Sequence, residues 1–367
     1  MPHVCIVSLN GYALFRPHSC AQVGGTEVQL YLLGQELEKR QGYRVSYVVG
    51  DFGQAPRERY GAIDVYRSIR LDKRWINLLV APWILWRELA HVSADVYISS
   101  PAGPEVGVIA LFCRLFRKKY IYRTASSVDC TYEKARDLGL VGGGMYVLGV
   151  LLAHQLVTQS TTDQKNLQNH FNRRAGVLPN GIDIPPARIA SEADGQYLLW
   201  VGSARTVKQP KLFLEIAKRF PDQPCYMVIS SAGDKQLREK IYAAGKRIAN
   251  LTIIENVRYT EMQSYFDKAR VYIGTSAYEG FPNVYLEACV SGVPIVSLNV
   301  NPDSFITRYN VGYCAQGDME KVCYYVNKLL KDDQDYHEKS KNAFEYVRRV
   351  HAISRVASAW TSLVEQP

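Results

Sequence analysis

The sequence predicts an α/β fold built from two doubly wound, Rossmann-like domains. Short apolar runs that are typical of buried parallel strands alternate with helical patterns in both halves of the 367-residue chain. A chain of this length can form two domains, each with its own core. A polar run with prolines, ending at Gly195, separates the two halves. We therefore expect a first domain over 1–186, onto which a C-terminal helix at 345–367 packs, and a second domain over 195–344.

The first domain opens with a βαβ unit. VCIVSL at 4–9 and YRVSYVVG at 43–50 have the pattern of buried strands. The helix between them is predicted to start at Thr26, because Gln29 stands three residues later and completes a capping-box spacing. Further strands are predicted at 94–100, 119–125 and 154–160.

Two stretches of the first domain are rich in Trp, Leu or Val: residues 75–93 and residues 145–153. Neither contains the roughly 18–20 consecutive apolar residues that a membrane-spanning helix needs, and Pro82 interrupts the first. Buried helices explain both stretches, and the alternative is an interfacial helix on a membrane. RLFRKK at 114–119 adds basic charge, which favours either docking on anionic lipid or a solvated charge run.

Composition limits the class of partner. The net charge of +9 favours an acidic partner: a nucleotide diphosphate, an anionic membrane face or nucleic acid. Zinc-finger spacings and basic helices with interleaved aromatic residues do not occur, so nucleic acid is not expected. The eight cysteines form no C-x-x-C pair and no signal-peptide pattern precedes the first strand, so we expect a cytoplasmic protein with reduced cysteines. Without G-x-G-x-x-G or G-x-x-x-x-G-K-[ST], a dinucleotide oxidoreductase and a P-loop enzyme are disfavoured.

The second domain is organised around residues 275–298, TSAYEGFPNVYLEACVSGVPIVSL. The preceding run VYIG at 271–274 predicts a buried parallel strand, and Pro282 suits the first turn of a helix. Gly292 and Pro294 end that helix before the next strand. The loop therefore lies at the carboxyl end of a strand, where open parallel sheets bind ligands. The helix start favours an anion such as a diphosphate.

Two glutamates stand in this segment, Glu279 at the end of the loop and Glu287 on the helix. A structural loop with two solvated carboxylates is one interpretation. The run E-G-F-P-N at 279–283, followed by Glu287, resembles the signature of the retaining glycosyltransferases of family 4, also called group 1. The resemblance implies the GT-B fold, in which two Rossmann-like domains face an interdomain cleft. Glu279 would lie near the transferred sugar, and Glu287 would hold the ribose hydroxyls. The implied donor-binding residues in this segment are Glu279, Gly280, Phe281, Pro282, Asn283, Val284 and Glu287.

A second motif extends the resemblance to the donor diphosphate. GSARTVKQP at 202–210 is similar to the family segment whose arginine and lysine neutralise that diphosphate, and Lys208 matches the lysine. Ser203 occupies the usual position of the arginine, so Arg205 is the candidate replacement. Two surface cations are the alternative interpretation.

The resemblance also covers the donor base and the first domain. IENVRYTEM at 254–262 resembles the segment whose backbone meets the base, near Val257. Gly24 and Gly25 stand where the family often has a Gly-Gly sequence, before a helix start at which the backbone can approach a phosphate. A plain turn also explains the double glycine. P-N-G-I-D at 179–183 resembles the family's domain junction.

The chain departs from the family at RTASSVDC, residues 123–130. Many family members have a histidine here that contacts the donor sugar, whereas this chain has Ser126, Ser127 and Asp129. Asp129 is the candidate for that contact, and a turn aspartate explains it equally.

The predicted function is the transfer of a sugar from a nucleotide-diphosphate-sugar donor to a hydroxyl acceptor, with retention at the anomeric carbon. The acceptor would be a glycan, a lipid-linked molecule or a small molecule. No metal or other cofactor is expected, and the D-x-D of Asp333 and Asp335 is assigned to a charged helix. Another GT-B activity, such as an epimerase or a phosphorylase, and a non-catalytic sugar-nucleotide-binding protein are the alternatives. The candidate catalytic residues are Glu279, Lys208, Arg205 and Asp129.

Overall fold

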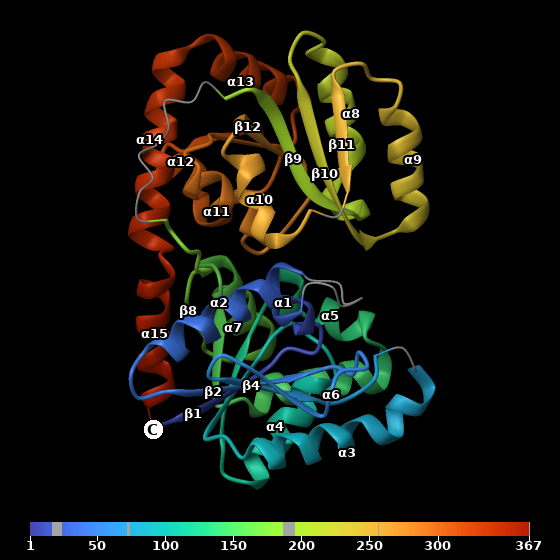
Figure 1. Cartoon of the computed structure of the whole chain (residues 1–367), viewed down its shortest axis with the longest axis vertical. Coiled ribbons are helices and arrows are strands. Elements are labelled where there is room, and N and C mark those ends of the chain that lie inside the picture. Colours follow the sequence, from blue (N-terminus) through green and yellow to red (C-terminus); the bar gives the residue numbers. More distant parts are fainter. Residues whose placement is uncertain (17–23, 72–73, 186–194, 256, 367) are drawn as a thin grey trace. The chain divides into compact units, whose positions relative to one another are not determined.

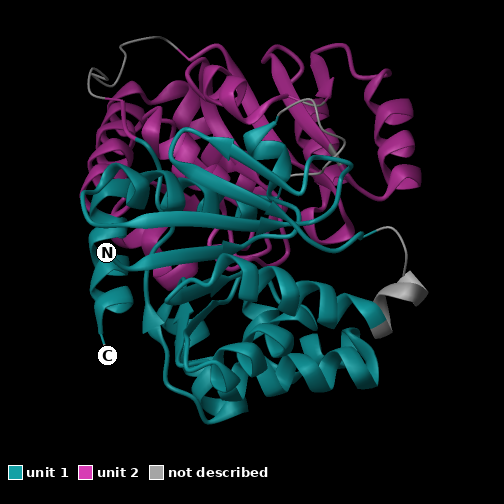
Figure 2. Cartoon of the chain, turned by 60° about the horizontal axis from the view of Figure 1, so that its bottom comes forward, with its two compact units in different colours: residues 1–183, 353–367 teal, residues 184–352 magenta. Residues whose placement is uncertain are grey.

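The computed structural model describes residues 1–16, 24–71, 74–185, 195–255 and 257–366. The chain forms two compact units, unit 1 with Met1–Asp183 and Ile353–Pro367, and unit 2 with Ile184–Ala352 (Figure 2). The C-terminal segment of unit 1 begins at Ile353, whereas the sequence predicted that it would begin eight residues earlier, at 345. Most of the polar run before Gly195 lies outside the described residues.

Unit 1 contains an eight-stranded sheet. Its strands are β1 (His3–Val7), β2 (Arg44–Val49), β3 (Arg57–Tyr60), β4 (Ile63–Arg67), β5 (Val96–Ser99), β6 (Lys119–Arg123), β7 (Gln155–Thr158) and β8 (Gly176–Val177). They follow the order β3-β4-β2-β1-β5-β6-β7-β8, and neighbouring strands are parallel except in the β3–β4 pair (Figure 1). In the register of β1, Ile6 pairs with Tyr47 on one side and Ile98 on the other.

Helices cover both faces of this sheet. They are α1 (Tyr12–Phe15), α2 (Gly25–Lys39), α3 (Arg74–Val92), α4 (Glu105–Leu115), η1 (Ser127–Cys130), α5 (Tyr132–Asp137), α6 (Gly139–Leu152), α7 (Thr161–Phe171) and α15 (Ile353–Glu365). Because side chains alternate along a strand, Cys5 and Val7 of β1 join a core with α3, α4, α6 and α7. Val4 and Ile6 join a second core with α2 and α15, which contains Trp360. Two buried faces are what a doubly wound domain requires.

Unit 2 contains a six-stranded parallel sheet in the order β11-β10-β9-β12-β13-β14. Its strands are β9 (Tyr197–Ala204), β10 (Cys225–Gly233), β11 (Leu251–Glu255), β12 (Ala269–Gly274), β13 (Ile295–Ser297) and β14 (Gly312–Cys314). Its helices are η2 (Thr206–Lys208), α8 (Pro210–Arg219), α9 (Lys235–Gly245), α10 (Tyr259–Phe266), α11 (Asn283–Val290), η3 (Pro302–Ser304), α12 (Phe305–Arg308), α13 (Met319–Lys331) and α14 (Asp333–Val350). Every residue of the central strand β12 is buried, as its apolar sequence predicts.

The start of α2 differs from the prediction. The helix begins before Thr26, and the carboxylate of Glu27 accepts a hydrogen bond from the N–H of Gly24 at 3.1 Å. Gln29 does not cap the helix. Its side-chain amide donates to the Gly181 carbonyl at 2.9 Å and accepts from the Gly181 N–H at 2.7 Å. The capping box assigned to Thr26 and Gln29 is therefore wrong, because a nearer glutamate reaches the helix start.

The C-terminal helix predicted at 345–367 is two helices, α14 and α15. The N–H of Ile353 donates to the carbonyl of Ile182 at 3.0 Å, and this strand-like bridge takes the backbone at 351–352 out of the helix. The chain re-enters unit 1 at this break. Pro82, by contrast, lies inside α3 without ending it. Among the helices that the structure describes, none is long and apolar enough to cross a bilayer.

Candidate active site

The candidate residues of unit 2 lie in loops that leave neighbouring strands. β9 has β10 on one side and β12 on the other, so the strand order reverses between β9 and β12. The chain leaves β9 into η2, which carries Lys208, and leaves β12 into the loop that carries Glu279. Both loops therefore open from the carboxyl ends of adjacent parallel strands at a topological switch point, where sheets of this kind bind ligands.

Lys208 and Glu279 form an ion pair in which the lysine Nζ lies 2.7 Å from the glutamate Oε1. The same oxygen accepts a hydrogen bond from the Ser276 hydroxyl at 2.5 Å. The Lys208 and Glu279 side chains are 23% and 19% exposed, so a ligand can reach both. The structure thus joins two candidates that came from separate motifs. It adds Ser276, which the sequence reasoning missed although an S-x-x-E spacing marks it.

Buried contacts fix the two loops to each other. The Thr275 hydroxyl donates to the Lys208 carbonyl at 2.7 Å and accepts from the Trp200 indole N–H at 2.8 Å. The N–H of Ala277 donates to the Val207 carbonyl at 2.8 Å. Because Thr275 and Trp200 are almost fully buried, these hydrogen bonds hold the backbone of both loops independently of the exposed ion pair.

The start of α11 is held against the sheet. Pro282 is the residue before the first helical position, and Gly280 is buried beside it. Phe281 packs its ring on Phe305 and His351, with 5.0 Å between ring centroids in both pairs. Phe281 is therefore a packing residue of unit 2. Asn283 and Val284 form the first turn of α11 and stay partly exposed, so their role in donor binding remains a prediction.

Glu287 lies on the second turn of α11. Its surroundings are protein on most sides, and the resulting desolvation raises its pKa from 4.5 to about 7. The side chain keeps a partly exposed surface, so a ligand hydroxyl can approach the carboxyl group. The Gln263 amide of α10 donates to the Glu287 carbonyl at 3.2 Å, which ties α10 to this turn.

Two further candidates of unit 2 lie on its surface. Arg205 stands immediately before η2 and is exposed, and its side chain forms no hydrogen bond or ion pair within the described ranges. It belongs to the same turn as Lys208, since the Lys208 N–H donates to the Arg205 carbonyl at 3.0 Å. Val257 is half-buried in the connection between β11 and α10. The assigned contacts of Arg205 with the diphosphate and of Val257 with the base stay predictions.

In unit 1, Gly24 and Gly25 are exposed at the start of α2. The Gly24 N–H already donates to the carboxylate of Glu27, so an anionic side chain of the protein sits at this helix start. A phosphate that approached Gly24 would have to compete with Glu27 for the N–H. The donor contact of the two glycines remains a prediction.

Asp129 is 3% exposed and serves the loop that contains it. Its carboxylate accepts hydrogen bonds from the Ala125 N–H at 2.8 Å and from the N–H and hydroxyl of Ser126 at 3.2 and 2.9 Å. Burial raises the pKa of Asp129, and these donors oppose that rise. The geometry matches the turn aspartate that was the alternative interpretation, and a role in catalysis is an untested prediction.

The D-x-D aspartates form ion pairs within unit 2. Asp333 lies 2.7 Å from Arg270, and Asp335 lies 2.7 Å from Lys339 and 3.7 Å from Lys328. Throughout the described ranges, no three His, Cys, Asp or Glu side chains come together in a way that could hold a metal ion.

Two family models match consecutive parts of the chain. The model of Glycosyltransferase Family 4 matches residues 23–184, and the model of Glycosyl transferases group 1 matches residues 184–346. A D-inositol 3-phosphate glycosyltransferase of Paenarthrobacter aurescens is 31% identical over 170 residues, which are 40% of this chain and 41% of that protein. An uncharacterized glycosyltransferase of Haemophilus influenzae is 21% identical over 229 residues, 59% of this chain and 63% of that protein. Both matches span less than two thirds of the relative's length.

Solved structures resemble the whole chain. Sucrose-phosphate synthase of Thermosynechococcus elongatus has a TM-score of 0.78 at 15% identity, covering 99% of this chain and 98% of that one. The E. coli trehalose-6-phosphate structure bound with UDP-2-fluoro glucose has a TM-score of 0.73 at 13% identity, covering 100% and 99%. These likenesses show the fold. Since the two family models together run from residue 23 to residue 346, the chain belongs to the group 1 glycosyltransferases and has their GT-B fold of two Rossmann-like domains.

Proposed function

We propose that this protein transfers a sugar from a nucleotide-diphosphate-sugar donor to a hydroxyl acceptor with retention at the anomeric carbon. The observation that carries the proposal is the ion pair of Lys208 with Glu279 at the switch point of unit 2, with Glu287 on the following helix. A cation, a carboxylate near it and a second carboxyl group on the adjoining helix match the three chemical parts of such a donor: diphosphate, sugar and ribose.

Lys208 neutralises the diphosphate in this proposal. Negative charge grows on the leaving diphosphate as the bond to the sugar breaks, so a fixed cation stabilises the transition state more than the bound donor. The amides of the first turn of α11 add the partial positive charge of a helix start. Arg205, exposed in the same turn as Lys208, supplies a further cation. These groups take the place that a divalent metal has in other transferases.

Glu279 orients the sugar and stabilises the positive charge that develops at the anomeric carbon. The bond from that carbon to the phosphate oxygen breaks, and the acceptor oxygen forms its bond on the same face. The acceptor hydroxyl gives its proton to the departing phosphate oxygen, which balances the step without a covalent enzyme intermediate. Ser276 holds the Glu279 Oε1 in place, and Lys208 exchanges part of its contact with that oxygen for the diphosphate.

The related structure with UDP-2-fluoro glucose and the relative named for D-inositol 3-phosphate support a nucleotide-sugar donor and a hydroxyl acceptor. A sugar-nucleotide-binding protein without transfer is the second candidate. A panel of nucleotide sugars should identify the donor by thermal stabilisation, about 2.7 kcal/mol at 100 times the dissociation constant. The stabilising donor is then incubated with a chelator, first alone and then with acceptors. Release of nucleotide diphosphate supports a transferase, whereas stabilisation without any turnover supports the binding protein.

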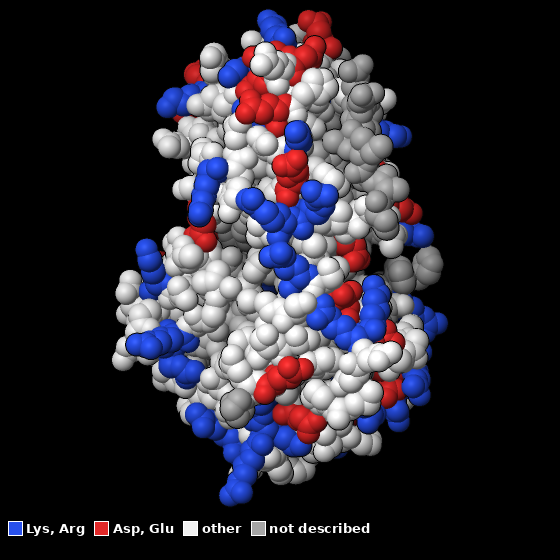
Figure 3. Space-filling view, turned by 90° about the vertical axis from the view of Figure 1, so that its left-hand side faces the viewer, with Lys and Arg blue, Asp and Glu red and all other residues white. Residues whose placement is uncertain are grey.

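We also propose that unit 1 docks on an anionic membrane face. We call the proposed surface the basic rim. It consists of Arg114, Leu115, Phe116 and Arg117 at the end of α4 and Leu151 at the end of α6. Leu115 and Phe116 are 64% and 50% exposed. The Arg114 side chain donates to the Leu152 carbonyl at 3.3 Å, which connects the end of α4 to the end of α6. Figure 3 shows a group of Lys and Arg side chains at the lower end of the face that it draws. On a surface of this kind, the cations contact anionic lipid headgroups and the exposed apolar side chains contact the acyl chains.

A further inference from the structure

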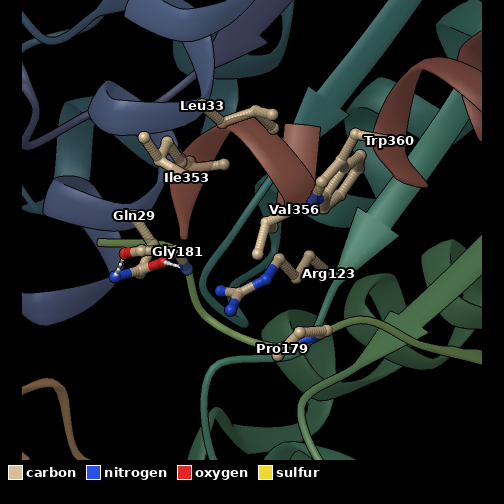
Figure 4. A pocket seen from close by; sticks show the side chains of 9 residues that line it. Gln29, Leu33, Arg123, Pro179, Gly181, Ile353, Val356 and Trp360 are labelled. Carbon is tan, nitrogen blue, oxygen red and sulfur yellow. Dashed lines mark hydrogen bonds between the residues drawn. The ribbon is translucent and has the colours of Figure 1, made fainter. Parts of the chain in front are cut away.

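Arg123 ends β6 with its charge inside unit 1. The residue is only 3% exposed, and its side chain lines a cavity of about 10 Å³. In Figure 4 the guanidinium points from β6 toward Gly181 and Pro179, beneath Val356. A cavity of about this volume holds one particle of the size of a water molecule. The remaining lining residues come from α2 and α15: Gln29, Leu30, Leu33, Ile353 and Trp360.

The charge of Arg123 has no counter-ion in the described part of the chain. One guanidinium nitrogen, Nη2, donates to the Asn180 side-chain oxygen, whereas the buried Nη1 has no hydrogen-bond partner there. Desolvation lowers the pKa of Arg123 to about 10, which leaves the group a cation at neutral pH. A buried cation without an opposite charge destabilises a fold strongly, so an arginine at such a place normally faces an anion.

The other polar groups of the cavity wall supply no negative charge. Gln29 and Gly181 satisfy each other through two hydrogen bonds. Ile353 and Val356 belong to the first turn of α15, and the N-terminal end of a helix carries partial positive charge. The guanidinium and the helix start therefore both make the cavity electropositive, while the apolar side chains of Leu30, Leu33 and Trp360 form another part of its wall.

We propose that this cavity is a binding site for one single-atom monovalent anion, of which chloride is the physiological representative. The anion accepts a hydrogen bond from Arg123 Nη1 and neutralises the buried guanidinium. Phosphate, sulfate and sugar acids are too large for a cavity of this volume. The site is built entirely by unit 1, and it is separate from the Lys208–Glu279 pair of unit 2.

The position of the site gives the anion a structural consequence. The cavity wall contains the segment before the chain leaves unit 1 at Asp183 and the first turn after it returns at Ile353. An anion held between β6, this segment and α15 ties both crossing segments to the sheet. Occupancy should therefore stabilise unit 1 and keep α15 docked, without taking part in the transfer reaction.

The test compares the melting temperature of the full chain in sodium chloride and in sodium gluconate at equal ionic strength. Chloride at ten times its dissociation constant should raise the melting temperature by roughly 3–6 °C, because only the folded state holds the site. Sodium sulfate at the same ionic strength should raise the melting temperature no more than sodium gluconate does, apart from general salt effects that Arg123→Met also shows. Arg123→Met should lose the chloride increment. Arg59→Met, which removes an exposed arginine of unit 1, should keep it.

Crystals grown with sodium bromide give a direct readout that does not depend on how well Arg123→Met folds. An anomalous bromide peak beside Arg123 Nη1 is the expected result. Density for a water molecule without anomalous signal at this place overturns the proposal. An equal chloride increment in wild type and in Arg123→Met overturns it as well.

Discussion

At the scale of the residue, the proton on Glu287 decides how firmly the proposed site holds a donor. Its pKa of about 7 means that the carboxyl group changes charge near neutral pH. In the proposed site the ionised form would accept hydrogen bonds from two ribose hydroxyls, and charge-assisted bonds of this kind are stronger than neutral ones. The neutral form is favoured in the unliganded fold, because desolvation raised the pKa. The contribution of Glu287 to the free energy of unfolding is therefore fully present at low pH and is lost as the pH rises through 7.

Donor affinity should have the opposite pH dependence. If only the ionised form binds the ribose, affinity should fall about tenfold between about pH 8 and about pH 6. Calorimetric titration of the donor across this range measures the effect, and Glu287→Gln should bind more weakly with a flat profile. An equally steep pH dependence in Glu287→Gln would remove this residue from the ribose role.

Lys208 should affect turnover more than donor binding. Lys208→Ala is expected to lower kcat by roughly 10²–10³-fold, because the cation meets the largest negative charge in the transition state. Lys211→Ala, which removes an exposed lysine of the neighbouring α8, is the control and should leave kcat unchanged. Steady-state kinetics with varied donor separate the two parameters. A higher KM with an unchanged kcat would contradict the role assigned to Lys208.

The sequence identified most of these residues singly and could not show which of them meet. Lys208 and Glu279 were predicted from motifs, yet their contact depends on the pairing of β9 with β12, which no local pattern contains. Ser276 stands three residues before Glu279 and was still missed, because this spacing alone does not show that the two side chains form a hydrogen bond within a loop. Asp129 looked like a ligand-facing aspartate, and only the structure showed that its carboxylate holds Ser126.

At the scale of the element, Gln29 connects α2 to the domain junction. Both hydrogen-bonding groups of its amide reach the buried backbone of Gly181. Gln29→Ala should lower the free energy of unfolding by about 1–3 kcal/mol, because it leaves a buried N–H and a buried carbonyl without these partners. Lys39→Ala on the exposed end of the same helix is the control. Denaturant titration of both variants tests the assignment, and equal stability of the two would contradict it.

The elements at the basic rim should bind a membrane. Flotation with anionic vesicles should recover the wild-type protein at low salt and lose it at high salt, since each cation near the surface contributes about 1 kcal/mol. Leu115→Ser with Phe116→Ser should reduce binding. Tyr324→Ser, at an exposed tyrosine of unit 2, should leave it unchanged. No binding of wild type at low salt would end this proposal.

Some element boundaries could not be predicted from local sequence patterns, because contacts between distant residues determine them. Local periodicity predicted many of the strands and helices of both units, since burial on one face repeats along each element. It did not predict the short strands β3, β4, β8 and β14. The break between α14 and α15 was invisible, because it arises from the hydrogen bond of Ile353 to the distant Ile182. The predicted helix start at Thr26 was misplaced for a related reason: both Glu27 and Gln29 stand at suitable spacings, and tertiary contact of Gln29 with Gly181 decides between them.

At the scale of the whole molecule, alternating strands and helices were sufficient to predict two doubly wound units. The order of the strands was not predictable, because it depends on which strands pair across the chain. That order creates the switch point between β9 and β12, where we propose that Glu279 acts as the electrostatic partner of the reacting sugar. A fold alone does not establish this, because related folds carry different reactions.

The turnover of Glu279→Gln shows whether the negative charge of Glu279 is needed for transfer. The substitution keeps the size of the side chain and an oxygen that can accept from Ser276 and Lys208, and it removes the charge. Nucleotide diphosphate release is measured with the identified donor and acceptor at saturating donor, alongside donor affinity by calorimetry. We expect kcat to fall by roughly 10²–10³-fold while donor affinity changes little. Wild-type turnover in Glu279→Gln would show that the charge of Glu279 has no role in the reaction.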